Sequence, residues 1–438
     1  MQKTRNRTVT AADASPSQTV AMATSTTTSL ATPVATTRPF PPMPKPVPTL
    51  TFGIEEEFFL VDPDTRDLCG DRTPALLSAC RARLGDRVHE ELHRAQIEIA
   101  TPVLHTASMA YESLHDLRHA VTRIANKLDL QPLAAGTHPF ASWRTQEPTG
   151  KARYERLMND YAAIGRRSLV CGLHVHVSVP EGVDRIALMN RLLPWLPLFL
   201  ALSCSSPFWR GQATGLASYR QAAYDEWPRA GLPDAFANDA DYARFLDTLH
   251  RAGATRDGSE VWWAIRPSSR FPTLELRICD ACTRIEDTLA LASAFRCLVR
   301  AHVRDPRLGA PTADTPCDAT TRRIVDENRW RAKRHGLAAE FIDPATGTTE
   351  SVADALARLC ALIAPDVASL RCEREIEHLR RILAIGTSAD AQLALYRQER
   401  DAMRSREEAT ARVTDWLVET TAGAGDGMRA PLRLAPAS

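Results

Sequence analysis

Three consecutive glutamates stand in an apolar run near the start of the chain. Glu55, Glu56 and Glu57 follow Ile54 and precede Phe58. In a β-strand alternate residues share a face, so we expect Glu55 and Glu57 to project together. Ile54 and Phe58 point the other way, with Glu56 between them. Two neighbouring carboxylates repel each other and need a cation, an arginine or water. The run therefore predicts a cation site, or else an exposed acidic face.

A further carboxylate stands in the run Gln96–Ala100. Glu98 lies between two isoleucines and shares a face with Gln96 and Ala100. It is either a second site residue or a solvated carboxylate on the polar side of an amphipathic strand. Glu91 comes seven residues earlier and would fall on the opposite face of an unbroken strand. It joins Glu98 only if a turn or bulge intervenes.

Two histidines alternate with apolar residues between Cys171 and Pro180. His174, His176 and Ser178 form one face of the predicted strand, while a leucine and three valines form the other. Both imidazoles therefore converge on one side. The pattern indicates either two histidines of a functional site or a pair of histidines that is only hydrogen-bonded in a polar cleft.

A fourth strand pattern runs from Thr273 to Cys279. Its apolar positions alternate with Glu275 and Arg277, and two further arginines, Arg266 and Arg270, precede it. Glu275 and Arg277 could pair on the surface, where such an ion pair contributes little. The neighbouring arginines favour an anion site instead.

One face of each of these four strands thus offers glutamate, histidine or arginine. Hard oxygen ligands suit Mg²⁺ or Mn²⁺ better than zinc, and arginine in the same cleft suits phosphate or carboxylate. The combination predicts a site where metal-bound nucleotide phosphates meet a carboxylate. The sequence contains neither G-x-G-x-x-G after a strand nor G-x-x-x-x-G-K-[ST], so it supports neither a Rossmann nor a P-loop site.

The elements that must position these residues are mixed without strict βαβ alternation, which favours an α+β fold. Apolar alternation predicts strands over 50–61, 96–100, 168–179, 261–266 and 273–279. Helical periodicity predicts helices over 108–128, 185–203, 285–303, 352–363 and 373–383, and a last, broken helical stretch over 389–418. Thr283 and Glu286 have the spacing of a capping box at the start of the 285–303 helix.

Composition sets the wider limits. The 438 residues carry a net charge of only +1, which argues against a nucleic-acid-binding protein. No run makes a credible membrane span, because prolines interrupt the most apolar one, and no secretory signal is evident. The ten cysteines are spread along the chain, and the pair Cys279 and Cys282 is better explained as buried thiols than as a zinc or redox site.

Three regions are expected. Residues 1–47 are rich in Thr, Ala, Ser and Pro and predict a disordered extension. Residues 48–420 are expected to form the folded domain that carries these motifs, which the resemblance below makes the catalytic domain, and residues 421–438 to form a flexible tail rich in Gly, Ala and Pro. A cytoplasmic location is expected.

At this point the ordered motifs resemble a known family, the ATP-dependent carboxylate–amine ligases of the glutamate–cysteine ligase type 2 group. The resemblance extends from about residue 50 to 420. It rests on an ordered set of motifs: Gly53-Ile-Glu-Glu-Glu, Ala134-Ala-Gly-Thr-His-Pro-Phe140, Cys171-Gly-Leu-His-Val-His-Val177, Ser205-Ser-Pro-Phe-Trp209, Thr214-Gly-Leu-Ala-Ser-Tyr-Arg220, the block from Trp262 to Asp280 and Glu327-Asn-Arg-Trp-Arg-Ala332.

The resemblance implies a glutamine synthetase-like catalytic fold, in which helices pack outside a curved, mainly antiparallel sheet and the site lies in its concave face. It assigns metal binding to six residues: Glu55, Glu57, Glu91, Glu98, His174 and Glu275. It makes Arg277 the arginine that faces phosphate, and Arg277 and Glu57 the catalytic residues. Substrate or phosphate contacts are expected from Arg220, Arg266 and Arg270, and only weakly from Arg331 and Arg334.

The implied cofactors are ATP and Mg²⁺ or Mn²⁺. A carboxylate, that of L-glutamate, would attack the γ-phosphorus of ATP, and an amine, that of L-cysteine, would attack the acyl phosphate. His176 or a carboxylate would serve as the base. The resemblance also implies a homodimer. Two alternatives remain open at this point: a non-catalytic protein that binds nucleotide or amino acid, and a metal-dependent hydrolase built on the two histidines.

Overall fold

The computed structural model describes residues 48–311 and 319–423. The expected extension, 1–47, and most of the expected tail lie outside these residues. The main sheet has strand order β2-β3-β1-β5-β9-β8, and β4 also pairs with β1. Every pairing in it is antiparallel. Its strands are β1 (Phe52–Val61), β2 (Val88–Glu90), β3 (Gln96–Ala100), β4 (Gln131–Leu133), β5 (Leu173–Ser178), β8 (Ile265–Pro267) and β9 (Thr273–Leu276).

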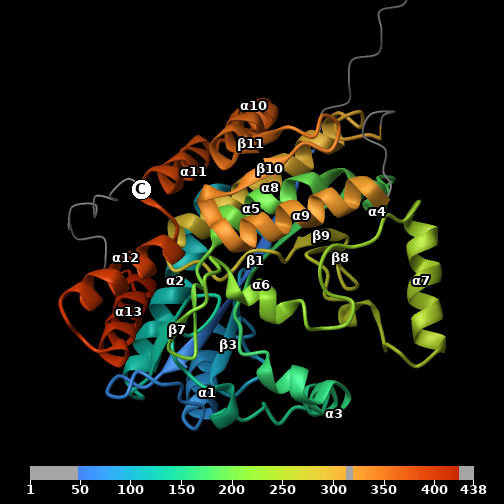
Figure 1. Cartoon of the computed structure of the whole chain (residues 1–438). Helices are drawn as coiled ribbons and strands as arrows, with labels where there is room; N and C mark the ends of the chain where they lie inside the picture. Colours follow the sequence, from blue (N-terminus) through green and yellow to red (C-terminus); the bar gives the residue numbers. More distant parts are fainter. Residues whose placement is uncertain (1–47, 312–318, 424–438) are drawn as a thin grey trace, which may run out of the picture. The chain divides into compact units, whose positions relative to one another are not determined.

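Two small hairpins and thirteen α-helices complete the described part of the chain (Figure 1). The hairpin strands are β6 (Phe208–Trp209), β7 (Gln212–Ala213), β10 (Glu340–Ile342) and β11 (Thr349–Ser351). The helices are α1 (Thr73–Leu84), α2 (Ala107–Asn126), α3 (Ala152–Arg167), α4 (Arg185–Leu192), α5 (Leu196–Ser203), α6 (Tyr219–Tyr224), α7 (Asp239–Arg251), α8 (Ile285–Arg304), α9 (Ala319–His335), α10 (Val352–Leu370), α11 (Glu373–Ile385), α12 (Ser388–Asp401) and α13 (Arg406–Thr421).

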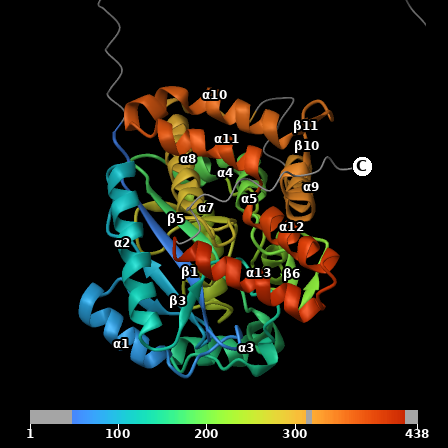
Figure 2. The same cartoon turned by 90° about the vertical axis from the view of Figure 1, so that its left-hand side faces the viewer.

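One face of the main sheet is the hydrophobic core. Alternate residues of the central strands, among them Ile54, Phe58, Val175 and Leu274, are at most 2% exposed and belong to one cluster. Helices α2 and α8 cover this face, and α10 and α11 pack on α8 (Figure 2). Because side chains alternate along a strand, the opposite face carries the polar residues. The sheet thus presents those residues to a cavity and its apolar residues to the helices.

The middle glutamate of the first motif anchors this packing. Glu56 is 2% exposed on the core face, and Arg118 on α2 donates to both of its carboxylate oxygens at 2.6 and 2.9 Å. The hydroxyl of Thr288 on α8 donates to Glu56 Oε1 at 2.6 Å. A buried charge is tolerated only when it is paired and hydrogen-bonded. Glu56 therefore ties β1 to both helices that cover it.

Several expected boundaries change in the structure. The apolar run 185–203 is divided into α4, a short 3₁₀ turn and α5, since Pro194 and Pro197 each begin a new helical segment. This segment is long and apolar enough to cross a membrane, but 78% of its most apolar window is buried inside the protein. The expected capping box is wrong: α8 has no side-chain cap, because the Thr283 hydroxyl donates to the carbonyl of Ala134 instead.

Candidate functional site

Strand register brings the expected carboxylates and histidine together. Glu55 lies opposite His174 across β1 and β5, and Glu57 lies opposite Glu98 across β1 and β3. Glu275 lies opposite His176 across β5 and β9. All of these side chains line one cavity of about 810 Å³. The alternation of residues in four separate strands thus converges on a single site.

Two groups of potential metal ligands share one imidazole. The ligand atoms of Glu55, His174 and Glu275 lie within 4.8 Å of one another, and so do those of Glu57, Glu98 and His174. His174 Nδ1 is 3.4 Å from a Glu55 oxygen, and its Nε2 is 3.8 Å from a Glu57 oxygen. This imidazole is 3% exposed. It therefore stands between the two groups with one ring nitrogen toward each.

Glu91 reaches the same cavity because the chain turns between β2 and β3. The turn follows Glu90, and β3 begins only at Gln96, which is the break that the sequence required. Burial and the charge of Glu57 raise the pKa of Glu91 to about 8. Burial and the charges of Glu55 and Glu91 raise the pKa of Glu98 well above its usual range. These carboxylates lack a positive charge close enough to keep them ionised.

Glu55 and Glu275 have the opposite electrostatic behaviour. Burial alone would raise the pKa of Glu55, but hydrogen bonds from His174 and His176 outweigh burial and lower it well below its usual value. Burial likewise opposes ionisation of Glu275, yet the charges of Arg277 and Arg266 lower its pKa far below the ordinary value. Both side chains are therefore carboxylates at neutral pH.

The residues present fit a divalent cation. Carboxylate oxygens dominate both groups, as Mg²⁺ and Mn²⁺ prefer. His174 Nε2 is buried without a hydrogen-bond partner among the described residues, and burial, with neighbouring carboxylates, raises the pKa values of Glu91 and Glu98. A cation between these groups would satisfy the imidazole nitrogen and allow the carboxylates to ionise.

The four expected arginines occupy different positions. Arg277 donates to Glu275 and, at 3.2 Å, to the Tyr224 hydroxyl. Arg266 donates to both oxygens of Glu275 at 2.7 and 3.2 Å, and its Nη1 donates to two backbone carbonyls. Arg270 is exposed on the turn between β8 and β9. All three arginines line the cavity. Arg266 directs its donors at Glu275 and the backbone, while Arg277 is shared between Glu275 and Tyr224.

Arg220 lies at the closed end of the cavity and is 1% exposed. Its guanidinium stacks over the Tyr224 ring at 5.3 Å and donates weakly to the Arg277 carbonyl at 3.3 Å. The Nε atoms of Arg220 and Arg277 are both buried without a hydrogen-bond partner among the described residues. Such unsatisfied donors are costly in an empty cavity. Each guanidinium therefore keeps one donor that an anion in the cavity could accept.

Sequence reasoning missed three contributors to this site: Tyr224, Gly172 and Asp280. A Cβ atom at Gly172 would lie 2.2 Å from Arg220 Nη2, and the Gly172 amide donates to Glu57 Oε2 at 2.6 Å. Only glycine lets the strand approach Arg220 this closely. The sequence signal for this role was the position of Gly172 directly before Leu173 in the histidine motif.

Asp280 joins two of the motifs noted in the sequence, Ser205–Trp209 and Thr214–Arg220. Its buried carboxylate accepts hydrogen bonds from the Ser205 amide and from the hydroxyls of Ser206 and Ser218. Ser206 Oγ in turn accepts from the Arg220 amide at 3.0 Å. The serines of these motifs therefore build the loops behind Arg220. Arg220 itself, the last residue of the second motif, lines the cavity.

The remaining expected residues have structural positions. Cys279 and Cys282 are buried free thiols, as expected. Arg331 pairs with Glu327 on α9 and donates to the Glu340 carbonyl, and neither it nor Arg334 lines the cavity. The histidine of the Gly-Thr-His-Pro-Phe motif, His138, is buried, which lowers its pKa to about 3.

Comparison with known proteins gives a consistent result. A model of glutamate–cysteine ligase family 2 matches residues 51–413. A putative glutamate–cysteine ligase 2 of Ectopseudomonas mendocina is 47% identical over 372 residues, which are 85% of this chain and 97% of that protein. A protein of the same description from Rhodospirillum rubrum is 43% identical over 389 residues, or 88% of this chain and 99% of that one.

Solved structures show the same fold at low sequence identity. The crystal structure of a glutamate–cysteine ligase from Francisella tularensis in complex with AMP superimposes with a TM-score of 0.62 at 13% identity, covering 85% of this chain and 89% of that one. The expected α+β fold, with an antiparallel sheet and packed helices, is thereby confirmed.

Proposed function

The chain belongs to glutamate–cysteine ligase family 2, a family of carboxylate–amine ligases, and we propose that it joins the γ-carboxylate of L-glutamate to the amine of L-cysteine at the expense of ATP. The observation that carries the proposal is the pair of ligand groups that share His174, with Arg277 beside one of them. A site of carboxylates and arginines suits phosphoryl transfer, in which the protein supplies positioning and charge.

The reaction has two steps. A glutamate carboxylate oxygen attacks the γ-phosphorus of ATP, the bond to the bridging oxygen breaks, and ADP leaves. The cysteine nitrogen then attacks the acyl carbon, phosphate leaves, and the nitrogen loses a proton. Bound Mg²⁺ or Mn²⁺ would neutralise the phosphate oxygens during the transfer.

We assign metal binding to Glu55, His174 and Glu275 in one group and to Glu57, Glu98 and the shared His174 in the other. Glu91, which lines the same cavity, joins the second group. Arg277 contacts the transferring phosphoryl group, and Arg220 binds a substrate anion at the closed end. Arg266 orients Glu275, since its donors are already directed at that carboxylate and at two carbonyls. His176 remains the candidate for the base.

The alternatives have less support. Within the described residues, each group of potential metal ligands contains a single histidine, whereas the zinc site of a hydrolase built on two histidines would need both. His176 Nδ1 instead lies 3.0 Å from the Thr273 hydroxyl. A protein that only binds nucleotide would not need two groups of metal-ligating carboxylates.

All nine described cysteines are free thiols, which supports a cytoplasmic location.

The test is an assay of phosphate release from Mg-ATP by the purified full chain. We expect release that requires both glutamate and an amino acid with a free amine, and a condensed product whose mass corresponds to the loss of one water. Replacing cysteine with each of the other amino acids would identify the amine. ATP binding without phosphate release for every pair would overturn the proposal.

A further inference from the structure

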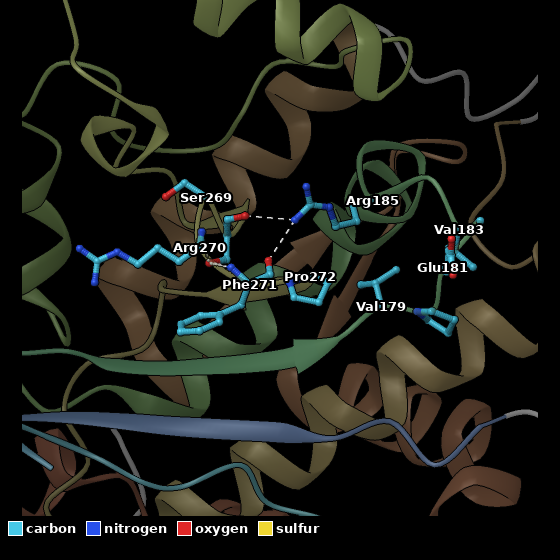
Figure 3. Close-up of a pocket in the computed structure, with 11 residues that line it drawn as sticks. Val179, Glu181, Val183, Arg185, Ser269, Arg270, Phe271 and Pro272 are labelled. Atoms are coloured by element: carbon cyan, nitrogen blue, oxygen red, sulfur yellow. Dashed lines mark hydrogen bonds between the residues drawn. The ribbon is translucent and has the colours of Figure 1, made fainter. Parts of the chain in front are cut away.

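A second cavity, of about 540 Å³, lies beside the catalytic cavity and shares a wall with it. The shared wall is the turn between β8 and β9, residues 268–272, which lines both cavities. Arg185, the first residue of α4, lines only the second cavity. Figure 3 shows this arrangement, with Arg185 on one side of the turn and Arg270 extending away from it.

Arg185 holds the turn from outside the catalytic cavity. Its Nη1 atom donates to the carbonyl of Ser268 at 3.0 Å and to that of Phe271 at 3.2 Å (Figure 3). Inside the turn, the Ser268 hydroxyl accepts from the amides of Arg270 and Phe271. All four residues from 269 to 272 are exposed. Backbone hydrogen bonds close its base, where the Ser268 amide donates to the Thr273 carbonyl and the Val179 amide donates to the Pro272 carbonyl.

The turn forms the rim of the catalytic cavity next to the metal-ligand groups. The Phe271 ring, 58% exposed, stands perpendicular to the His176 ring with centroids 6.3 Å apart. His176 Nε2 lies 3.5 Å from Glu55 and 3.9 Å from Glu275. Arg277 follows Leu276, the partner of Val175, and so lies level with His174, while Arg220 lies against Gly172, one step farther along. An exposed aromatic ring and the exposed Arg270 guanidinium thus lie at the His176 end of the cavity, and the buried Arg220 guanidinium lies at the other, closed end.

We propose that Arg185 is a positioning residue for nucleotide binding, acting through the turn that places Phe271 and Arg270 at the cavity rim. The inference rests on the proposed function. With the triphosphate at Glu55, His174 and Glu275, the nucleoside extends past His176 to the rim. There an aromatic face and a cation suit a heteroaromatic base. The closed end, with its unsatisfied guanidinium donors, suits the carboxylate of the amino acid.

The chain supplies a matched control for Arg185. Arg191 lies on the same helix and also donates from Nη1 to two carbonyls, those of His302 and Pro306, at 3.0 Å each. It lines neither cavity. We expect Arg185→Met to raise the KM for ATP by roughly tenfold, while kcat and the KM for each amino acid stay within about twofold. Arg191→Met should leave all three constants near those of the wild type, and Arg185→Lys should recover part of the loss.

A second measurement does not depend on activity. Limited trypsin digestion should cut after Arg270 several times faster in Arg185→Met than in the wild type or Arg191→Met, with the new terminus at Phe271 identified by mass. Equal KM values for ATP in the Arg185 and Arg191 variants would overturn the inference, as would equal cleavage rates. Parallel changes in kcat and in every KM would also overturn it, because they indicate general disruption. A wild type without ATP-dependent ligation would instead refute the proposed function, and the digestion would still test the anchoring of the turn.

Discussion

Glu57 and Glu98 lie directly opposite each other across strands β1 and β3, and both carboxylates face the same cavity. Like charges placed opposite each other in an antiparallel pair are destabilising. Strand register therefore imposes a repulsion between the ionised groups, and burial together with the neighbouring charges raises the pKa of Glu98 well above its usual value. A cation bound between the two carboxylates would replace this repulsion with attraction. The stability of the protein should therefore depend on whether the cation is bound.

The first prediction concerns this pair. Glu98→Gln removes the buried ionisable group, so the metal-free protein should melt about 1–3 °C higher at alkaline pH, corresponding to about 1 kcal/mol, because there the wild-type carboxylate is driven to ionise beside Glu57. The rise in melting temperature on adding Mn²⁺ or Mg²⁺ should become smaller in the variant, since one ligand is lost. Glu147→Gln, at an exposed position, serves as the control and should change neither value. An unchanged metal effect in Glu98→Gln would argue against this carboxylate as a ligand.

The second prediction separates two adjacent glutamates. Glu55→Gln should lower kcat by about 100-fold or more with the melting temperature nearly unchanged, because a metal ligand is lost on the cavity face. Glu56→Gln should instead cost about 3 kcal/mol of unfolding free energy, since Arg118 loses its buried partner. The folded Glu56 variant should keep most of its activity. Chemical denaturation and steady-state kinetics on both variants measure this contrast. Normal turnover in Glu55→Gln would show that Glu55 is not a metal ligand.

The third prediction concerns pH. The pKa of Glu91, about 8, lies above the value in an unfolded chain, so the folded state binds more protons than the unfolded state between about pH 5 and 8. The stability from this group is complete below that range and is lost as the pH rises through it. The metal-free protein should therefore melt at lower temperature at pH 8 than at pH 6. Glu91→Gln should flatten this dependence, and an equally steep dependence in the variant would assign it to another group.

The fourth prediction uses two glycines. Gly172→Ala should displace Arg220, since the new Cβ would lie 2.2 Å from its Nη2 atom. The KM for the carboxylate substrate should rise by roughly tenfold, and stability should fall by about 1–2 kcal/mol. Gly53, in β1, is the control, because an added Cβ there meets nothing within 4 Å. Gly53→Ala should keep wild-type stability, and a Gly172→Ala protein with unaltered stability and KM would show that Arg220 has room to move.

Alternation along the strands was enough to predict which residues share the cavity face. Glu55, Glu57, Glu98, His174 and Glu275 meet there because each lies in a short strand with period-two patterning, and that patterning survives in the structure. The same rule predicted only conditionally that Glu91 would join them, because a strand pattern does not show where the chain turns.

Contacts between distant segments could not be read from local patterns. Glu56 depends on Arg118, which is 62 residues away, and on Thr288, which is 232 residues away. The capping-box prediction failed for the same reason, since the Thr283 hydroxyl is used by Ala134, 149 residues away. The role of Arg266 also needed the structure, because only the pairing of β8 with β9 shows that its donors are directed at Glu275.

An acyl phosphate forms only when the carboxylate substrate itself attacks the γ-phosphorus of ATP. Glutamate labelled with ¹⁸O in its γ-carboxylate tests this most directly, with cysteine, Mg-ATP and the purified full chain. Attack by the carboxylate leaves one of its oxygens on phosphorus, so the released phosphate should carry one ¹⁸O atom for each amide formed. Amide formation with unlabelled phosphate would contradict the acyl phosphate route and the part assigned here to Arg277.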